Sequence, residues 1–415
     1  MKPAPRFCRR MNNVLAAISP VLAGLLCSTT ASAQTSPYYV GLSLSVAHDS
    51  NLSRVRDGQV LPAGASQADT VSTAALVAGL DQPIGRGRLF GSASLNTNNY
   101  ANNQNYNNQG YSLNLGLDWQ TIERISGKVA LASSRSVRAD VRDRQDQVIL
   151  KKNAENANQL DASVSVGLVT ALSAEASLMA RDVRYSEIEA DYREYKQNAG
   201  SVGLRYRLGG ATSVGITLSQ TKNDYPNLLT GQGDRSDRRN RNDVALSASW
   251  VPSGASSLSA SLSQGKTTHD RFTERDFSAA TGALTWVWTP SGKLRLNTRL
   301  GRDAGQDAER ATTAFSRTTD SLRVRTDYEA TGKIGAYLSG YVYRRSQTGS
   351  GVFVSGVSGT DTGTNLTLGA RWAALRSVSV GCEVSTERLG SNSNPLLNTA
   401  YSSNAVSCFG QFVLQ

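Results

Sequence analysis

The side chains with the clearest capacity for binding chemistry in this chain are arginines and tyrosines that recur at alternate positions. Arg323 and Arg325 stand two residues apart, as do Tyr341 and Tyr343, so each pair points to one side of an extended strand. Guanidinium groups bind carboxylates and phosphates, and phenol rings offer flat apolar faces with a polar edge. Eleven residues of these types, all on the polar face of a predicted strand, are candidate solute contacts: Arg205, Arg207, Lys293, Arg295, Arg299, Arg323, Arg325, Arg371, Tyr337, Tyr341 and Tyr343.

Acid–base chemistry has few candidates. His48 and His269 are the only histidines, each followed by an aspartate. A hydrolase needs such a base beside a nucleophile or an activated water. No serine or aspartate with recognisable spacing accompanies either histidine, so we expect no enzymatic activity, no cofactor and no catalytic residue.

Two cysteines remain after residue 33, Cys382 and Cys408. They fall on the last two predicted strands, which are antiparallel neighbours, at similar distances from the turn between them. A cross-strand disulfide is therefore expected in an oxidising compartment, with two free thiols as the alternative. No nearby histidine completes a metal-ligand set, so no metal site is predicted.

The elements that must position these residues are strands with one apolar and one polar face. In residues 111–119, tyrosine, leucines and tryptophan take the odd positions, whereas serine, asparagine, glycine and aspartate take the even ones. We count about eighteen such segments. Their apolar positions span residues 40–46, 74–80, 89–95, 113–117, 129–131, 160–168, 174–178, 202–208, 214–218, 244–250, 258–262, 284–288, 294–300, 322–328, 334–342, 366–372, 378–384 and 412–414.

Export signals precede these segments. Residues 1–33 combine Lys2, Arg6, Arg9 and Arg10 with an apolar stretch and the small-residue site 31–33, which predicts a secretory signal peptide. No later run reaches the length of an apolar membrane helix, and the mean hydropathy is −0.34. Residues 34–415 are predicted to form an all-β, transmembrane, antiparallel up-and-down barrel of about 18 strands of about ten residues each.

The connections alternate in length. Short turns with glycine or proline, such as 82–85 and 290–292, follow the even strands, and long polar stretches follow the odd ones, most clearly 96–109, 136–153, 222–242 and 346–362. Bacterial outer-membrane barrels have short periplasmic turns and long external loops. We therefore expect the outer membrane of a Gram-negative bacterium, contact with its lipid, and both termini in the periplasm. Acids interleave the bases of these loops, so no nucleic acid partner is expected.

The tryptophans support this orientation. All five take the apolar phase near the end of an even strand: Trp119, Trp250, Trp286, Trp288 and Trp372. They are predicted to form a belt at the periplasmic membrane interface, and the alternative is a set of core anchors in a soluble sheet.

Inward-facing arginines must meet water or acids, because an unpaired arginine facing lipid at mid-depth costs about 2–4 kcal/mol. They could hold the wall rigid by pairing with acids such as Glu175, Asp327 and Glu383, or could attract anionic solutes, and the two roles are compatible. Tyr337, Tyr341 and Tyr343 could stack on sugar rings, although tyrosine also occurs at barrel rims for interfacial reasons.

Two segments resemble a known family. Residues 46–54, Val-Ala-His-Asp-Ser-Asn-Leu-Ser-Arg, are similar to the aromatic-Asp-Ser-Asn-Leu-aromatic-Arg segment of EpsL-type exopolysaccharide-biosynthesis outer-membrane proteins, the putative β-barrel porin 2 family. Asp49, Asn51, Leu52 and Arg54 match, whereas histidine and serine stand at the aromatic positions. Residues 379–382 and 401–415 resemble the two-cysteine end of that family. Many outer-membrane barrels end in an aromatic residue that the assembly machinery reads, whereas this chain ends in Gln415.

The resemblance implies a role in moving an extracellular polysaccharide across the outer membrane. It implies as partners the polymer, its periplasmic export components and the outer-membrane assembly machinery. We expect passive passage through a polar, arginine-lined lumen. A general diffusion porin for small solutes and a structural or adhesive barrel with a closed lumen are the alternatives.

Overall fold

The computed structural model describes residues 36–139, 148, 150–167, 171–227, 229–230, 233–234, 236–310, 313–350, 358–392 and 400–415. The predicted signal peptide (1–33) and Leu168 of the predicted sixth strand lie outside these residues. The chain divides into two units, residues 1–36 and 37–415, and only the second is described below. None of the helices in the described residues is long and apolar enough to cross a membrane, a result that does not bear on spans made by strands.

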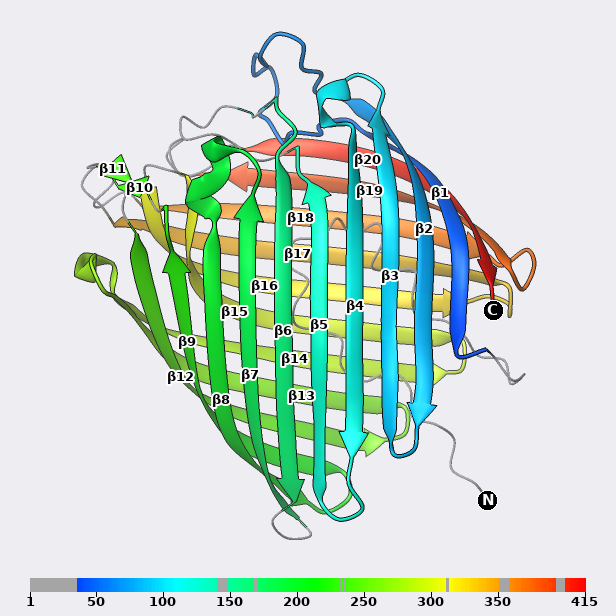
Figure 1. The fold of residues 1–415 in the computed structure, drawn as a ribbon, viewed down its shortest axis with the longest axis vertical. Coiled ribbons are helices and arrows are strands. Elements are labelled where there is room, and N and C mark those ends of the chain that lie inside the picture. Colours follow the sequence, from blue (N-terminus) through cyan, green and yellow to red (C-terminus); the bar gives the residue numbers. More distant parts are fainter. Residues whose placement is uncertain are drawn as a thin grey trace. The chain divides into compact units, whose positions relative to one another are not determined.

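Residues 37–415 form a closed antiparallel β-barrel (Figure 1). Each strand pairs with its sequence neighbours, and β1 pairs with both β2 and β20, which closes the sheet. The eighteen barrel strands in the described part of the chain are β1 (Tyr38–Asp49), β2 (Asp69–Ile84), β3 (Gly87–Tyr100), β4 (Asn108–Gln120), β5 (Ile125–Val137), β6 (Ala154–Gly167), β7 (Leu172–Tyr185), β8 (Tyr195–Leu208), β9 (Thr212–Tyr225), β12 (Asp237–Ser253), β13 (Ser256–His269), β14 (Phe277–Ser291), β15 (Leu294–Arg310), β16 (Thr313–Glu329), β17 (Ile334–Ser350), β18 (Ser358–Trp372), β19 (Val378–Ser391) and β20 (Tyr401–Leu414).

The remaining elements lie in the connections. A small hairpin pairs β10 (Leu229–Thr230) with β11 (Gly233–Asp234), and three short 3₁₀ helices are η1 (Gln104–Tyr106), η2 (Ile188–Arg193) and η3 (Thr273–Arg275). They all lie at one end of the barrel, which we call the loop end (top and left side of Figure 1). The opposite end, which we call the turn end, carries the short connections after even-numbered barrel strands, together with the start of β1 and the end of β20.

The predicted fold class is confirmed, and each of the eighteen predicted segments, apart from Leu168, falls within one barrel strand. The predicted strand length of about ten residues is wrong, because the strands run for 12 to 17 residues. β12 shows the reason. Its first six residues, Asp237–Asn242, are polar on both faces, yet all six pair with β9 and those from Arg239 onward also pair with β13, since ladder hydrogen bonds need no apolar side chain.

The longer strands shorten the predicted loops. β3 and β4 leave only residues 101–107 between them, and β9 and β12 leave 226–236. β15 and β16 pair as far as Arg310 and Thr313, so this loop-end connection is short, contrary to the expected alternation. Most of 138–153 and all of 351–357 lie outside the described residues.

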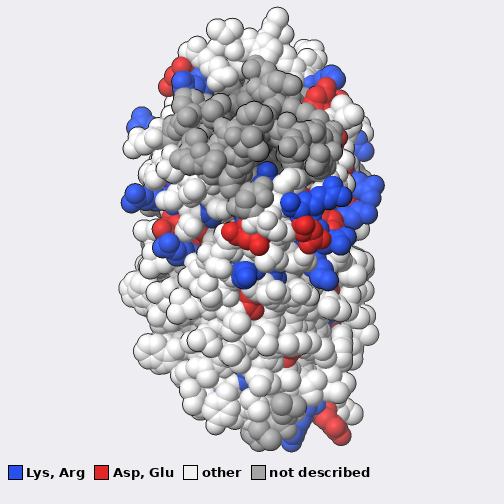
Figure 2. Space-filling view, turned by 90° about the vertical axis from the view of Figure 1, so that its left-hand side faces the viewer, with Lys and Arg blue, Asp and Glu red and all other residues white. Residues whose placement is uncertain are grey.

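The apolar residues at alternate positions of each strand form the outer surface of the barrel. Large apolar side chains such as Leu42, Leu246 and Leu368 are about half exposed there. Figure 2 shows one side of the barrel, on which charged residues gather in the upper half and at the lower edge and leave a largely uncharged zone between. This surface suits contact with acyl chains.

The polar phase forms the inner surface, as contacts between non-adjacent strands show. The Tyr337 hydroxyl on β17 donates a hydrogen bond past β18 to Glu383 on β19. Arg241 on β12 donates to the Ala304 carbonyl on β15 at 3.3 Å, three strands away. Side chains can meet in this way only on the concave face.

Candidate functional site: the inner wall and the loop-end lock

The inner wall of β16 and β17 carries a row of arginines on tyrosines. The Arg325 guanidinium lies 4.2 Å from the centroid of Tyr337, and that of Arg323 lies 4.7 Å from Tyr341. A third, looser contact joins Arg345 to Tyr343 at 6.0 Å. We call this set the arginine–tyrosine ladder: Arg323, Arg325, Arg345, Tyr337, Tyr341 and Tyr343. The register of β16 on β17 produces it, since Arg323 stands directly opposite Tyr341.

Glycines on β18 seat two of the tyrosines. Gly369 stands opposite Tyr337, and Gly363 stands opposite Tyr343. A Cβ added at either glycine would collide with the ring opposite, so only glycine leaves room for the ring to lie flat on the wall. The Tyr341 and Tyr343 rings lie 5.4 Å apart at 34°. Tyr341 and Tyr343 therefore form one aromatic surface on β17, and Tyr337 lies further along the same face.

Several inner-wall arginines have acidic partners. Arg325 pairs with Asp327 at 2.8 Å, and Arg205 pairs with Glu175 at 2.8 Å. Arg345 pairs with the fully buried Asp361 at 3.2 Å. The contacts with Asp327 and Glu175 involve acids that the sequence offered as partners, and the rigidifying role of the wall arginines stays a prediction.

The arginines of β15 differ. Among the described residues, neither Arg295 nor Arg299 forms an ion pair, and Arg323 on β16 has the Tyr341 ring as its neighbour but no carboxylate. Arg299 stands directly opposite Arg323 in the β15–β16 register. Asp327, which stands opposite Arg295, is engaged by Arg325. Two like charges thus face each other across adjacent strands.

The other predicted lumen cations lie at the turn end. Arg207 is exposed near the end of β8, and Lys293 lies in the β14–β15 turn, where its Nζ donates to the Ala330 carbonyl at 3.3 Å. Arg371 is half-buried near the end of β18. These three line the rim, whereas the ladder and β15 place their arginines along the wall.

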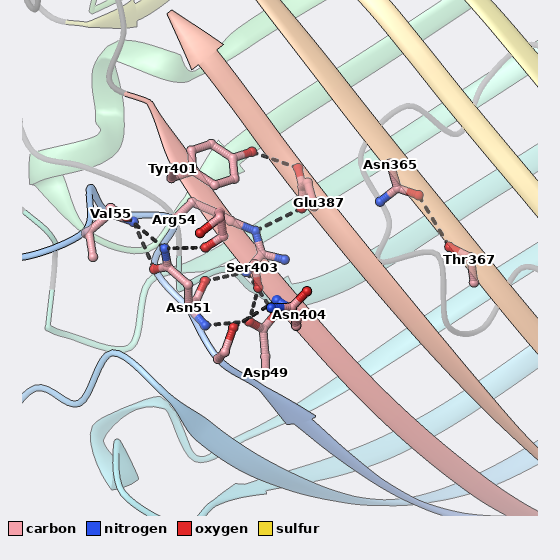
Figure 3. Close-up of polar contacts among 12 residues, drawn as sticks. Asp49, Asn51, Arg54, Val55, Asn365, Thr367, Glu387, Tyr401, Ser403 and Asn404 are labelled. Atoms are coloured by element: carbon pink, nitrogen blue, oxygen red, sulfur yellow. Dashed lines mark hydrogen bonds and ion pairs between the residues drawn. The ribbon is translucent and has the colours of Figure 1, made fainter.

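The segment that resembles the family motif is held against the barrel wall by a polar network at the loop end (Figure 3). We call this network the loop-end lock: Asp49, Asn51, Arg54, Glu387, Tyr401 and Ser403. Arg54 donates to Glu387 on β19 through Nε at 3.0 Å, and to Asp49 at the end of β1 through Nη1 at 2.8 Å. Glu387 also accepts a hydrogen bond from the Tyr401 hydroxyl at 2.7 Å. Burial opposes the charged form of Arg54, but Asp49 and Glu387 outweigh it, so the pKa of Arg54 is raised. The guanidinium ties the β1–β2 connection to the wall.

Asn51 fixes the backbone of this connection. Its side chain donates to the Val55 carbonyl at 2.7 Å and to the Ser402 carbonyl on β20 at 2.9 Å, and it accepts from the Val55 amide at 3.0 Å. Asn51 is 1% exposed and Val55 is fully buried. Arg54 has φ +52°, the single left-handed non-glycine residue in the described part of the chain. The fourth motif residue, Leu52, is half-buried and donates its amide to the Gln67 carbonyl.

Sequence reasoning did not single out Glu387, Tyr401 or Ser403 of the lock. All three occupy inward-facing positions of β19 and β20, and the alternation of polar and apolar residues could have indicated this. Nothing in the sequence, however, places them beside Asp49 and Arg54. Ser403 donates to Asp49 at 2.5 Å across the β1–β20 seam. Barrel closure brings these residues together over 333 to 354 positions.

The loop-end part of the β15–β16 hairpin reaches into the barrel. β14 pairs with β15 only as far as Arg302, so the following residues of β15 leave the wall at that point. Ala304 then meets Arg241 of β12, and β15 also contacts η2 in the β7–β8 connection. The hairpin therefore narrows the interior at the loop end.

The five tryptophans lie near the turn end on the outward phase, as their sequence positions require. Trp250, Trp288 and Trp372 are 38–51% exposed. Trp286 stacks on Trp288 at 5.7 Å and donates to the Ser256 hydroxyl at 3.0 Å. Their contact with a membrane interface stays a prediction.

Cys382 and Cys408 stand directly opposite each other on β19 and β20, on the outer face, and are joined by a disulfide. Both histidines lie at the loop-end end of a strand, His48 in β1 and His269 in β13. His48 contacts Thr70 at 3.0 Å, and His269 contacts Asp276, not Asp270, at 3.2 Å. The described residues contain no group of three or more histidines, cysteines or acids that could hold a metal ion.

No protein-family model matches the chain, and no curated protein matches it. Among solved structures it is similar to Pseudomonas aeruginosa OccK2 (OpdF), at 12% identity and TM-score 0.49 over 91% of this chain and 98% of that one. The complex of that protein with glucuronate gives 13% and 0.48 over 91% and 98%. A bacterial polysaccharide outer membrane secretin gives 10% identity and 0.35 over 90% and 98%. These similarities concern the barrel architecture alone, and the family resemblance stays a prediction.

Proposed function

We propose that this chain is a non-enzymatic channel in the outer membrane of a Gram-negative bacterium that takes part in exporting an extracellular polysaccharide. The observation that carries the proposal is the arginine–tyrosine ladder on the inner wall. An apolar exterior and a polar interior give the barrel the surfaces of a channel. The ladder adds to that wall a strip with the chemistry of a saccharide contact.

The strip suits a sugar because its two components are complementary. Flat tyrosine rings accept the C–H faces of pyranose rings, and guanidinium groups donate to hydroxyl and carboxylate oxygens. The row follows β17 from Tyr337 to Tyr343, so successive units of a polymer could contact successive rungs. Passage along such a surface requires no energy source and no covalent step.

Sequence features support the pathway. The motif residues Asp49, Asn51, Leu52 and Arg54 resemble a segment of exopolysaccharide-associated barrels. A signal peptide at 1–33 would direct the chain to the periplasm. There the assembly machinery would insert the barrel with both termini in the periplasm, where periplasmic export components would meet the turn end.

The test is deletion of the gene followed by complementation. Loss of surface polymer with periplasmic accumulation, restored by the wild-type gene, is expected. Complementation with Tyr341→Ala should restore secretion only in part, whereas Tyr328→Ala, which removes an outward-facing tyrosine from β16, should restore it fully. Normal secretion in the deletion strain would refute polysaccharide export. Conductance unaffected by polymer would then favour a general diffusion porin.

A structural or adhesive barrel is the second candidate, and the β15–β16 hairpin favours it. The contacts of Ala304 with Arg241 and of β15 with η2 narrow the interior at the loop end. Purified protein in planar bilayers distinguishes the two functions. A channel conducts, whereas a closed barrel shows no conductance and binds polymer only from outside.

A further inference from the structure

The described part of the inner wall holds a pair of arginines that face each other without an ion pair to a carboxylate. Arg299 on β15 and Arg323 on β16 are directly opposed in register and share the inward phase. Side chains opposed in this way have Cβ atoms about 4.5–5.5 Å apart, and like charges there are unfavourable. A wall selected only for rigidity would place a carboxylate between them.

The nearby acids do not do so. Asp327, four residues from Arg323, is taken by Arg325 at 2.8 Å. Asp303, four residues from Arg299 on β15, forms no ion pair with it in the described part of the chain. In contrast, Arg345 and Arg205 on the same inner surface each have a carboxylate within 3.2 Å. Neither guanidinium of the pair therefore has the direct ion pair that Arg205, Arg325 and Arg345 have.

A flat ring lies beside this pair. The Arg323 guanidinium is 4.7 Å from the Tyr341 centroid, and Tyr341 continues into Tyr343. The ring limits the positions that the guanidinium can take, so less entropy is lost when an anion binds. One face of the wall thus presents two guanidiniums and an aromatic surface together.

We infer that Arg299, Arg323 and Tyr341 form a binding subsite for an acidic saccharide unit, whose carboxylate bridges the two guanidiniums while its ring lies along the tyrosines. The inference rests on the proposed channel function and names its substrate class: a polymer that carries carboxylates. Paired guanidiniums donate parallel hydrogen bonds to a carboxylate, a geometry that a neutral sugar hydroxyl does not reproduce. The subsite therefore favours ligands that combine a carboxylate with a sugar ring.

The test measures block of single-channel current by oligosaccharides. Oligogalacturonate is compared with a maltooligosaccharide of the same number of units and with a cationic glucosamine oligomer. Wild-type protein should bind the acidic oligomer at least tenfold more tightly than the other two. Raising the salt from 0.1 M to 1 M should reduce this preference, because the Debye length falls from about 10 Å to about 3 Å.

Arg299→Gln and Arg323→Gln should each weaken oligogalacturonate binding about tenfold, or about 1.4 kcal/mol, and leave maltooligosaccharide binding unchanged. Arg299→Lys should retain part of the preference, because it keeps the charge but loses the planar fork. Arg302→Gln is the matched control, since it removes an outward-facing arginine from the same strand. Heat-dependent mobility in denaturing gels verifies that each variant is folded.

Three results would overturn the inference. The wild type could bind acidic and neutral oligomers equally, or the glutamine variants could keep the preference for the acidic oligomer. The glutamine variants could also lose chloride selectivity without losing affinity for oligogalacturonate. The last would assign the pair to small anions alone. Absence of any conductance would instead refute the channel. Calorimetric binding of oligogalacturonate to the detergent-solubilised barrel would then decide the subsite on its own.

Discussion

Substitution of Arg54 tests whether the loop-end lock holds the β1–β2 connection against the barrel wall. Arg54→Ala removes the contacts to Glu387 at 3.0 Å and to Asp49 at 2.8 Å. The Arg54, Asp49 and Glu387 side chains are 28%, 19% and 32% exposed, so solvent screens these pairs in part. Charge-assisted hydrogen bonds contribute about 1.5–3 kcal/mol when shielded, and exposed pairs about 0.2–1 kcal/mol. We expect the free energy of opening of the β1–β2 connection to fall by about 1–2 kcal/mol.

Arg54→Gly separates the side-chain contacts from the backbone. It loses the same contacts, but glycine adopts the φ of +52° without the cost of about 1 kcal/mol that alanine bears there. The glycine variant should therefore open about fivefold less often than the alanine variant. Arg56→Ala is the control, because Arg56 is an exposed residue of the same connection without an ion pair in the described part of the chain.

The assay is hydrogen–deuterium exchange of peptides covering residues 50–68. The Leu52 amide, bonded to Gln67, and the Val55 amide, bonded to Asn51, report opening. Exchange should rise about fivefold to thirtyfold in Arg54→Ala, less in Arg54→Gly and not in Arg56→Ala. Glycine exchanging as fast as alanine, or Arg56→Ala matching Arg54→Ala, would refute the reasoning.

Three further substitutions or treatments test the wall itself. Gly369→Ala should destabilise the barrel by about 1–3 kcal/mol, because the added methyl group collides with the Tyr337 ring. A second change, Tyr337→Ala, should relieve most of that cost, as measured by denaturant unfolding from lipid vesicles. Additive effects of the two changes would contradict the contact. Leu366→Arg should cost about 2–4 kcal/mol because it places a charge in lipid, whereas Thr367→Arg, one residue along on the inner face, should cost far less; equal costs would invert the assignment of faces. Reduction of the β19–β20 disulfide should lower the free energy of unfolding by about 2–4 kcal/mol. Thiol labelling of the unreduced protein without residues 1–33 should find no free cysteine.

The barrel architecture could be predicted because its signal is local. In residues 111–119 the side chains alternate between apolar and polar, and the strand geometry converts that alternation directly into an outer and an inner face. Leu113 and Leu115 are accordingly 42% and 39% exposed on the outer surface. The strand ends were not predictable from apolar positions. β12 starts at Asp237, in a stretch polar on both faces, because backbone pairing continues without help from side chains.

The candidate sites depend on distances along the chain that no local pattern records. Arg299 and Arg323 meet because β15 and β16 pair in a register set by their short connection. Arg54 meets Glu387 across 333 positions because β1 closes on β20, which itself pairs with β19. A slip of one residue in either pairing would turn the facing side chains to the opposite surface.

By itself, the sequence determined where along the chain the strands lie, which of their side chains face outward and which end carries the short turns, because a period of two and the turn residues are local properties of the chain. Only the tertiary structure decided which inward arginines receive carboxylates, which pair stays opposed without one, and how the motif residues lock onto a distant wall. Those outcomes follow from register and closure, and both are fixed by the hydrogen-bonded pairing of all eighteen strands together.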